Sequence, residues 1–408
     1  MFPLPLTQLL GHYGAFGVYI LIGFAFGYVL ESAGFGNSKK LAAQFYFKDM
    51  TVLKVMFGAI IVAMLLIFTA SGLGLLDYNL VWVNPTYLWP GIVGGLVMGF
   101  GFIIGGFCPG TSLVAAATAK LDGVFFVLGV LFGIFLFGET VGLYDEWWNS
   151  SYMGRFTLPE LFGLPTGIVV LGLIVMALGM FWAAEKLEQH FGDADPNTAP
   201  RWRYVAAAII FLGGIGLIIL GQPTTADRWQ AIAPEKEATL AERAVQIHPG
   251  ELLTTLHDPK IKVRMIDVRS EADYNLFHIL DAQRVSPDDL LALTPELIAE
   301  PANTVVVVIS NDETAATDAW KLLVAESVPN VYILEGGINN WLATFTKDAF
   351  GPDYVATDGR DEQLRYAFTA ALGARHPAAK PDPHLFDLTY IPKIQLQLKR
   401  APGSGGCG

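Results

Sequence analysis

The sequence predicts an α-helical polytopic membrane domain followed by an α/β domain with a parallel sheet. Three observations lead to this fold class. Only 16% of the 408 residues are charged, whereas soluble proteins carry about 25%. The charge is uneven, because the first 221 residues hold 9 Lys and Arg against 12 Asp and Glu, and the remainder holds 17 against 26. In the second half, β-branched strand patterns alternate with helical patterns, which is typical of a parallel sheet.

Six apolar segments predict membrane spans, since a bilayer-crossing helix needs about 20 apolar residues. They lie at about 14–31, 53–71, 88–106, 123–138, 161–184 and 203–221. The charge-free run 78–119 is too long for one crossing, and Pro109 interrupts it. Because proline favours the first position of a helix, we expect a short re-entrant half-helix at about 110–119. One long kinked helix is the alternative.

The membrane domain repeats itself at an offset of 72 residues. Each unit consists of a span, a short interrupted segment and a second span, so we expect repeats at about 14–71 and 88–140, with extra spans at about 161–184 and 203–221. Such duplication is typical of transporters whose site lies between the repeats. A glycine-rich packing face is the alternative, and the repeats can be parallel or inverted. The matching pairs are Gly23 and Gly95, Gly27 and Gly99, Phe35 and Phe107, Ala43 and Ala115, and Lys48 and Lys120.

Lysine and arginine gather in alternate loops, which indicates orientation because basic loops stay in the cytoplasm. Basic residues follow the first span, precede the fourth and lie between the fifth and sixth, whereas the loops at 72–87 and 140–160 carry only Arg155. We therefore expect both chain ends outside. The spans then lie in the lipid of a bacterial inner (plasma) membrane, and the C-terminal domain is periplasmic or extracellular.

Composition divides the chain into a membrane domain at 1–221, a polar linker at 222–244, an α/β domain at 245–345 and a C-terminal extension with a flexible tail at 346–408. In this extension, the alternation of Lys393–Lys399 predicts an edge strand.

Two classes of site are not expected. The two cysteines, Cys108 and Cys407, lie far apart in the sequence and have no metal-ligand spacing, so we expect no disulfide framework, no metal site and no cofactor. The net charge of −12, with no basic block, argues against nucleic acid as a partner.

The segment Gly105–Ser112 is the candidate substrate site of the membrane domain. Cys108 precedes the proline that starts the half-helix, and the N–H groups and dipole at a helix N-terminus favour an anion. A small buried apolar role for the cysteine is the alternative, since most free cysteines have that role. The expected binding residues here are Cys108, Pro109, Gly110, Thr111 and Ser112, of which the last two add hydroxyl donors.

The Gly-x-x-Cys-Pro-Gly-Thr-Ser block and Leu121-Asp122-Gly123 resemble the YeeE/YedE-type sulfur transport family, over about residues 14–184. This resemblance implies uptake of a small sulfur oxyanion, thiosulfate, through a pore with several cysteines. The chain keeps one pore cysteine, and the matching point of the first repeat has Asn37 and Ser38. We expect these two polar groups to substitute for a second cysteine, or the substrate to differ.

The second half resembles a rhodanese domain over about residues 245–345. The resemblance implies a five-stranded parallel sheet with helices on both faces. It rests on Asp267-Val268-Arg269, the turn Phe277–Ala282, Glu335-Gly336-Gly337-Ile338 and Trp341.

The rhodanese-like domain departs from its family at the active loop. The family's catalytic cysteine follows the central strand, where this chain has Ser310. No arginine follows, and Asp312 and Glu313 bring negative charge to an anion pocket. Serine cannot carry sulfane sulfur, so we expect no catalytic residue here and a binding or assembly role instead.

The chain ends in a Gly/Ser-rich arm that carries Cys407. Such a tethered thiol is a possible sulfur carrier, and a disordered end is the alternative. Three functions stay open: transport of a small sulfur compound, a membrane-tethered sulfur relay that uses this thiol, and a non-transporting scaffold or sensor. A soluble sulfurtransferase is a possible partner in the first two.

Overall fold

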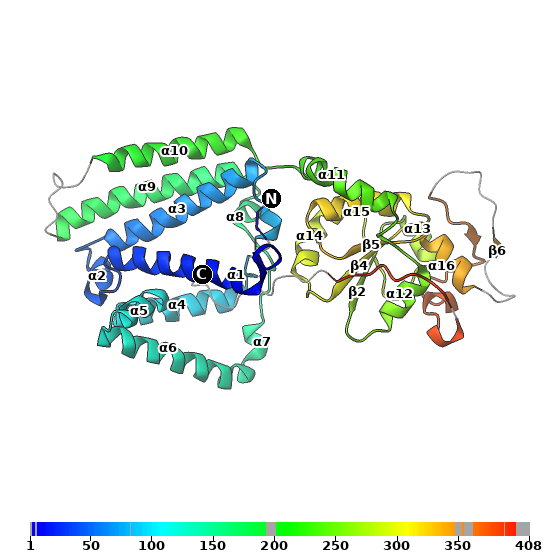
Figure 1. Cartoon of the computed structure of the whole chain (residues 1–408), viewed down its shortest axis with the longest axis horizontal. Helices are drawn as coiled ribbons and strands as arrows, with labels where there is room; N and C mark the ends of the chain where they lie inside the picture. Colours follow the sequence, from blue (N-terminus) through cyan, green and yellow to red (C-terminus); the bar gives the residue numbers. More distant parts are fainter. Residues whose placement is uncertain are drawn as a thin grey trace. The chain divides into compact units, whose positions relative to one another are not determined.

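The computed structural model describes residues 2–4, 6–81, 83–192, 201–346, 353–354, 362–386 and 388–396. They form two compact units that divide after Gln222, and each unit is described by itself (Figure 1). Among the described residues, six helices are long and apolar enough to span a membrane, which confirms the predicted number of spans. They are α1 (Leu6–Ser32), α3 (Thr51–Gly72), α4 (Leu88–Gly105), α6 (Leu121–Thr140), α9 (Thr166–Phe191) and α10 (Trp202–Leu220).

Short helices separate the long ones. The helix α2 (Ser38–Ala42) and the 3-10 turn η1 (Ala43–Tyr46) lie between α1 and α3, and α5 (Pro109–Ala117) lies between α4 and α6. The short helix expected at about 110–119 is therefore α5, and the order of long, short and long helix occurs twice. The remaining short elements are η2 (Tyr78–Leu80), η3 (Val141–Leu143), α7 (Asp145–Trp148) and α8 (Leu158–Phe162).

The fifth span begins later than the expected residue 161. Gly163 has a φ of 61°, in the left-handed region, and ends α8 there. Pro165 then precedes the first residue of α9, Thr166. The apolar run thus contains two helices with a turn between them.

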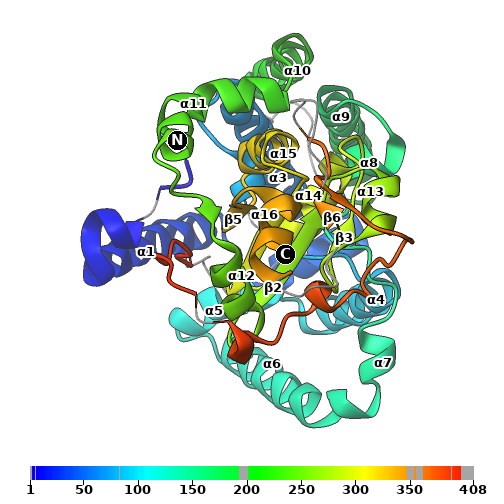
Figure 2. The same cartoon turned by 90° about the vertical axis from the view of Figure 1, so that its right-hand side faces the viewer.

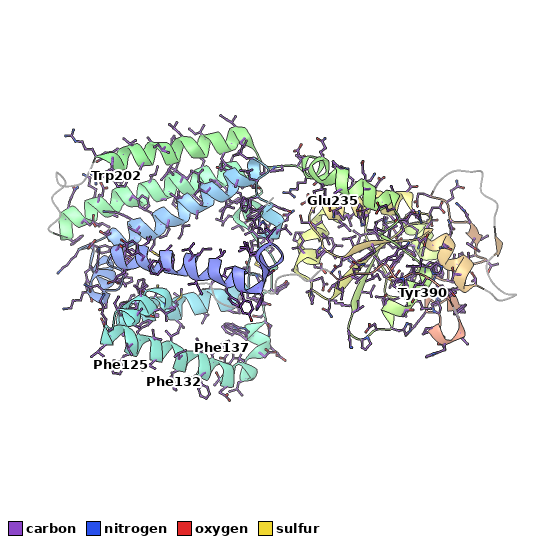
Figure 3. The ribbon with its side chains drawn as sticks, in the orientation of Figure 1. Phe125, Phe132, Phe137, Trp202, Glu235 and Tyr390 are labelled. Atoms are coloured by element: carbon purple, nitrogen blue, oxygen red, sulfur yellow. The ribbon has the colours of Figure 1, made fainter. Side chains whose placement is uncertain are left out.

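Apolar side chains cover the outside of the first unit. Phe125 and Phe132 of α6 are 70% and 64% exposed and project from that helix in Figure 3. Inside, α3, α9 and α10 pack side by side around a cluster of buried residues (Figure 1). An apolar exterior of this extent is what a helix bundle presents to lipid.

The second unit contains a five-stranded parallel sheet in the order β1-β5-β4-β2-β3, which confirms the sheet that the rhodanese resemblance implied. The strands are β1 (Gln246–Ile247), β2 (Lys262–Asp267), β3 (Gln283–Arg284), β4 (Thr304–Ile309) and β5 (Val331–Leu334). The helices are α11 (Thr225–Ala241), α12 (Pro249–Leu256), α13 (Glu271–Leu276), α14 (Leu290–Ala299), α15 (Thr314–Ala325) and α16 (Gly337–Phe345).

Helices cover both faces of this sheet (Figure 2). Side chains alternate between the faces of a strand, so Val305 and Val307 of the central strand β4 pack with residues of α12 and α16. Val306 and Val308 pack on the other face with residues of α14 and α15. Burial on both faces explains why the five residues of β4 after Thr304 are all apolar.

The expected linker at 222–244 contains α11, which packs within the second unit. Trp229 contacts the core, and the side chains of Thr225 and Arg228 both bind the carboxylate of Glu326. This segment is thus attached to α15, at whose end Glu326 lies.

The C-terminal extension contains a small antiparallel pair, β6 (Asp353–Tyr354) and β7 (Tyr366–Ala367), and the 3-10 turns η4 (Pro377–Ala379) and η5 (Pro383–Leu385). The expected edge strand at Lys393–Lys399 is wrong for residues 393–396, which form no strand. Side chains take the place of a neighbouring strand there: Glu251 accepts the N–H groups of Lys393 and Ile394 at 2.7 Å. The rest of that segment lies outside the described residues.

Candidate functional site

Cys108 lies at the N-terminus of α5 and caps it. Its Sγ accepts a hydrogen bond from the backbone N–H of Thr111 at 3.4 Å, and its own N–H donates to the Thr111 hydroxyl at 3.0 Å. This reciprocal pair is a capping box, and Pro109 occupies the first helical position. The cysteine is partly exposed while this cap is formed.

The hydroxyl groups of this segment are less available than the sequence indicates. Thr111 and Ser112 are 4% and 1% exposed. The Ser112 hydroxyl donates to the Pro109 carbonyl at 2.8 Å, and the Thr111 hydroxyl bonds to Cys108. Both side chains therefore hold the first turn of α5 in shape, and their role in binding stays a prediction.

A glycine turn brings the cysteine loop against the first repeat. Gly106 ends α4 with a φ of 69°, and its N–H donates to the Phe102 carbonyl at 2.9 Å. A Cβ added at Gly106 would lie 3.0 Å from the backbone oxygen of Ser38. The loop before α5 thus contacts the start of α2, which is the matching point of the first repeat.

The two repeats share one apolar core beside these loops. Phe35 and Phe107, which match at the 72-residue offset, are both buried in a cluster with Leu41 and Ala115. The expected site residues Ser38 and Cys108 are thereby brought to the same interface between repeats. Asn37 differs, because it is exposed and its side chain caps α2 by accepting the N–H of Lys39 at 3.0 Å.

Charged groups at this interface were not among the expected site residues. The Ser38 hydroxyl donates to Asp122 Oδ2 at 2.8 Å. Lys120 Nζ lies 3.3 Å from Glu31 Oε1 and beside Gly36. The partners of Lys120 and Asp122 lie more than 80 positions away in the sequence. The sequence therefore did not indicate that either residue belongs to the site.

The rhodanese-like loop begins where β4 ends. Ser310 follows the last residue of that strand and is fully buried, as is Asn311 at 2% exposure. Their carbonyl groups accept the N–H groups of Ile338 and Asn339 at 2.9 and 3.1 Å. Gly337 makes this approach possible, because a Cβ there would overlap three carbonyl oxygens of the loop.

The two acidic residues of this loop pair with arginines from distant segments, one of which also pairs with Glu335. Asp312 pairs with Arg365 at 3.1 Å, and Glu313 pairs with Arg243 at 2.8 Å. The hydrogen bond to Glu313 is the main cause that raises the pKa of the Arg243 guanidinium. The sequence has no arginine directly after Ser310, as noted above. The two arginines that pair with this loop come from distant positions in the chain.

Cys407, the expected sulfur carrier, lies outside the described residues. Its role therefore stays a prediction, as does the flexible nature of the arm that carries it.

Comparisons with known proteins agree with both resemblances. The family model described as "Sulphur transport" matches residues 32–245, and the model described as "Rhodanese-like domain" matches residues 248–344. The thiosulfate transporter TsuA of Spirochaeta thermophila is 25% identical over 217 residues, which are 49% of this chain and 62% of that protein. The chain thus spans less than two thirds of this relative. No solved structure matches the chain.

Proposed function

The chain belongs to the sulphur transport family, whose model covers more than half of it, and on that premise we propose that it is a membrane transporter or channel for thiosulfate. One observation carries the proposal: the cysteine-capped helix α5 meets the start of α2 at the interface between two repeats. That is where duplicated transporters place their substrate. The similarity to a thiosulfate transporter supports thiosulfate as the proposed substrate.

The proposed site supplies both kinds of contact that thiosulfate offers. The N-terminal turn of α5 presents the positive end of a helix dipole to the oxyanion end. The cap engages the N–H groups of Cys108 and Thr111, and Pro109 has none, so Gly110 carries the backbone N–H proposed to bind there. The dipole contributes about 0.3–1 kcal/mol near a surface and up to about 2 kcal/mol when partly buried. Hydrogen bonds to a charged acceptor contribute about 1.5–3 kcal/mol each. The soft Sγ of Cys108 contacts the sulfane sulfur, which is a weaker hydrogen-bond acceptor than the oxygen atoms.

Ser38 stands in the first repeat where a second cysteine would lie. Its hydroxyl donates its one proton to Asp122, so it can donate to an oxyanion only when this hydrogen bond is exchanged for one to the substrate. We propose that Ser38 takes this role and that Asn37 contributes through the start of α2, which it caps.

Uptake of radiolabelled thiosulfate into proteoliposomes tests the function. We expect saturable uptake that excess unlabelled thiosulfate suppresses and that protein-free liposomes lack. The same vesicles loaded with radiolabelled chloride control for leaks. Thiosulfate uptake no faster than in protein-free liposomes would rule the proposal out.

The proposed orientation places the C-terminal domain on the outer side of a bacterial inner membrane. The Lys and Arg distribution motivates it. A membrane-impermeant maleimide added to intact spheroplasts is then expected to label the wild-type chain at Cys407. A Cys407→Ser chain, which keeps Cys108, is the matched control and shows the labelling that belongs to the membrane domain. Labelling at Cys407 only after lysis means the reverse orientation.

We propose that the rhodanese-like domain binds a partner protein, which we expect to be a soluble sulfurtransferase. We also propose that the domain has no sulfurtransferase activity of its own. Ser310 lacks the sulfur that a persulfide needs, and its hydroxyl is buried. The purified full-length chain is expected to show no cyanide-dependent cleavage of thiosulfate above buffer. Cys407→Ser serves as the control, because turnover that survives this change has to come from the domain itself and contradicts the prediction.

A further inference from the structure

A carboxylate of the chain itself is bound by the loop that follows β4. The carboxylate of Glu362, about fifty residues downstream, lies among donors of the Ser310–Ala315 loop. Its Oε1 accepts the Ser310 hydroxyl at 3.1 Å and the Ala315 N–H at 3.0 Å. Its Oε2 accepts the Asn311 N–H at 3.0 Å and the Asp312 N–H at 3.5 Å. Each carboxylate oxygen thus has two donors.

Electrostatics favour an anion at this position. Ala315 lies in the first turn of α15, a helix of 12 residues, whose N-terminal N–H groups and dipole attract negative charge. Asp312 and Glu313 beside it are paired with Arg365 and Arg243, and Glu335 shares Arg243 with Glu313. The repulsion of anions that these two residues led us to expect is therefore reduced, and the loop accepts a carboxylate.

Glu362 is held by its backbone as well as by its side chain. Its N–H donates to Asp312 Oδ2 at 3.3 Å, and its carbonyl accepts from Asn311 Nδ2 at 3.0 Å. Its φ is 61°, in the left-handed region that residues other than glycine seldom adopt. Asn339 of α16 extends the attachment by binding the backbone of Gln363 and Arg365 at 2.8 Å.

We propose that Glu362 is a tethered ligand that closes the loop, and that a free oxyanion binds the same donors only when the carboxylate leaves. Ser310 and Asn311 are buried beneath it, so the two ligands exclude each other. A cavity of about 500 Å³ adjoins the loop and gives the displaced side chain a polar place to go. Its lining includes Asp312, Glu313, Asn339, Asn340 and Arg365.

The contact makes the loop autoinhibited. A ligand that binds only the open form has its apparent affinity reduced to the extent that the closed form is populated, and a carboxylate on the same chain competes without a loss of translational freedom. Oxyanion binding then displaces the Glu362 side chain, while Arg365 stays paired with Asp312. The inference rests on this unit alone and stands even if the membrane domain carries a different substrate.

Removal of the carboxylate tests the proposal. The full-length chain in detergent, with Cys108→Ala in every sample to remove the proposed membrane site, is titrated with sulfate and with thiosulfate by calorimetry. Glu362→Ala is expected to bind both at least about tenfold more tightly than the chain with Glu362. Glu296→Ala is the matched control, because it removes an exposed carboxylate of the same unit that pairs with Arg264 away from the loop; its affinity is expected to stay unchanged.

Hydrogen–deuterium exchange supplies a second readout, whose first comparison is made without added anion. In Glu362→Ala, amides of the peptide covering 310–316 are expected to exchange at least about tenfold faster, and sulfate is expected to slow them again. Amides of β4 and α14 report that the unit stays folded, and Glu362→Gln repeats the test with a side chain of the same size. Equal anion affinity and equal loop exchange with and without the carboxylate would overturn the proposal.

Discussion

Replacement of Cys108 by alanine is expected to abolish thiosulfate uptake, with a loss of about a hundredfold. The change removes the sulfur contact and one partner of the capping box at the start of α5. Each lost interaction with a charged ligand corresponds to about 1.5–3 kcal/mol, which is roughly tenfold to a hundredfold in affinity. Uptake by proteoliposomes with matched protein content measures the effect. Loss of the cap alone costs about 1 kcal/mol, so insertion and folding are expected to persist.

Cys108→Ser separates the two contributions of this side chain. A serine hydroxyl is a better N-cap than a thiol and keeps the acceptor that faces the Thr111 N–H. If this variant also loses nearly all uptake, the missing element is the soft sulfur. Thr118→Ala, at the other end of the same helix, is the matched control and is expected to transport normally, because its hydroxyl donates to the carbonyl groups of Val114 and Ala115 within α5. Normal uptake by Cys108→Ala would refute a pore-cysteine mechanism and favour a substrate without sulfane sulfur.

The membrane fold could be predicted from the sequence because its signals are local. Apolar runs of sufficient length indicate spans regardless of what packs against them, and Pro109 marks the start of α5 by its own geometry. The start of the fifth span was less predictable, since Gly163 turns the chain inside a continuous apolar run. The rhodanese-like sheet was predictable for a related reason: the resemblance rests on signature residues, and β4 is buried on both faces.

What the sequence could not predict depends on contacts between distant residues. Ser38 and Asp122 are 84 positions apart, and nothing around either one indicates the other. Glu362 is a single carboxylate in a segment without periodicity, and its importance comes from four donors about fifty positions earlier. The expectation of repulsion at Asp312 and Glu313 considered their charges without Arg243 and Arg365, whose pairing exists only in the folded unit.

Gly123 is the second position at which a small change is expected to have a large effect. It lies in the first turn of α6, directly against α5: an added Cβ would lie 2.5 Å from Ala115 Cβ and 2.8 Å from the backbone nitrogen of Ala116. Backbone cannot yield as a flexible side chain can, so Gly123→Ala forces the two helices apart, and overpacking of this kind costs about 1–3 kcal/mol. We expect uptake to fall at least about tenfold.

We expect Gly123→Ala to lower uptake by more than the loss of stability alone would, because Asp122 lies next to Gly123. Its Oδ1 accepts the Gly123 N–H at 3.0 Å while its Oδ2 holds the Ser38 hydroxyl, so a displaced α6 moves the group that joins the two repeats. Gly129→Ala on the same helix is the matched control, since among the described residues no atom outside the neighbouring backbone of α6 lies within 4 Å of a Cβ there. It is expected to keep full uptake. Thermal unfolding of both variants in detergent shows whether the bundle persists, and a Gly123→Ala protein that transports like Gly129→Ala would mean that α5 and α6 do not need this close contact.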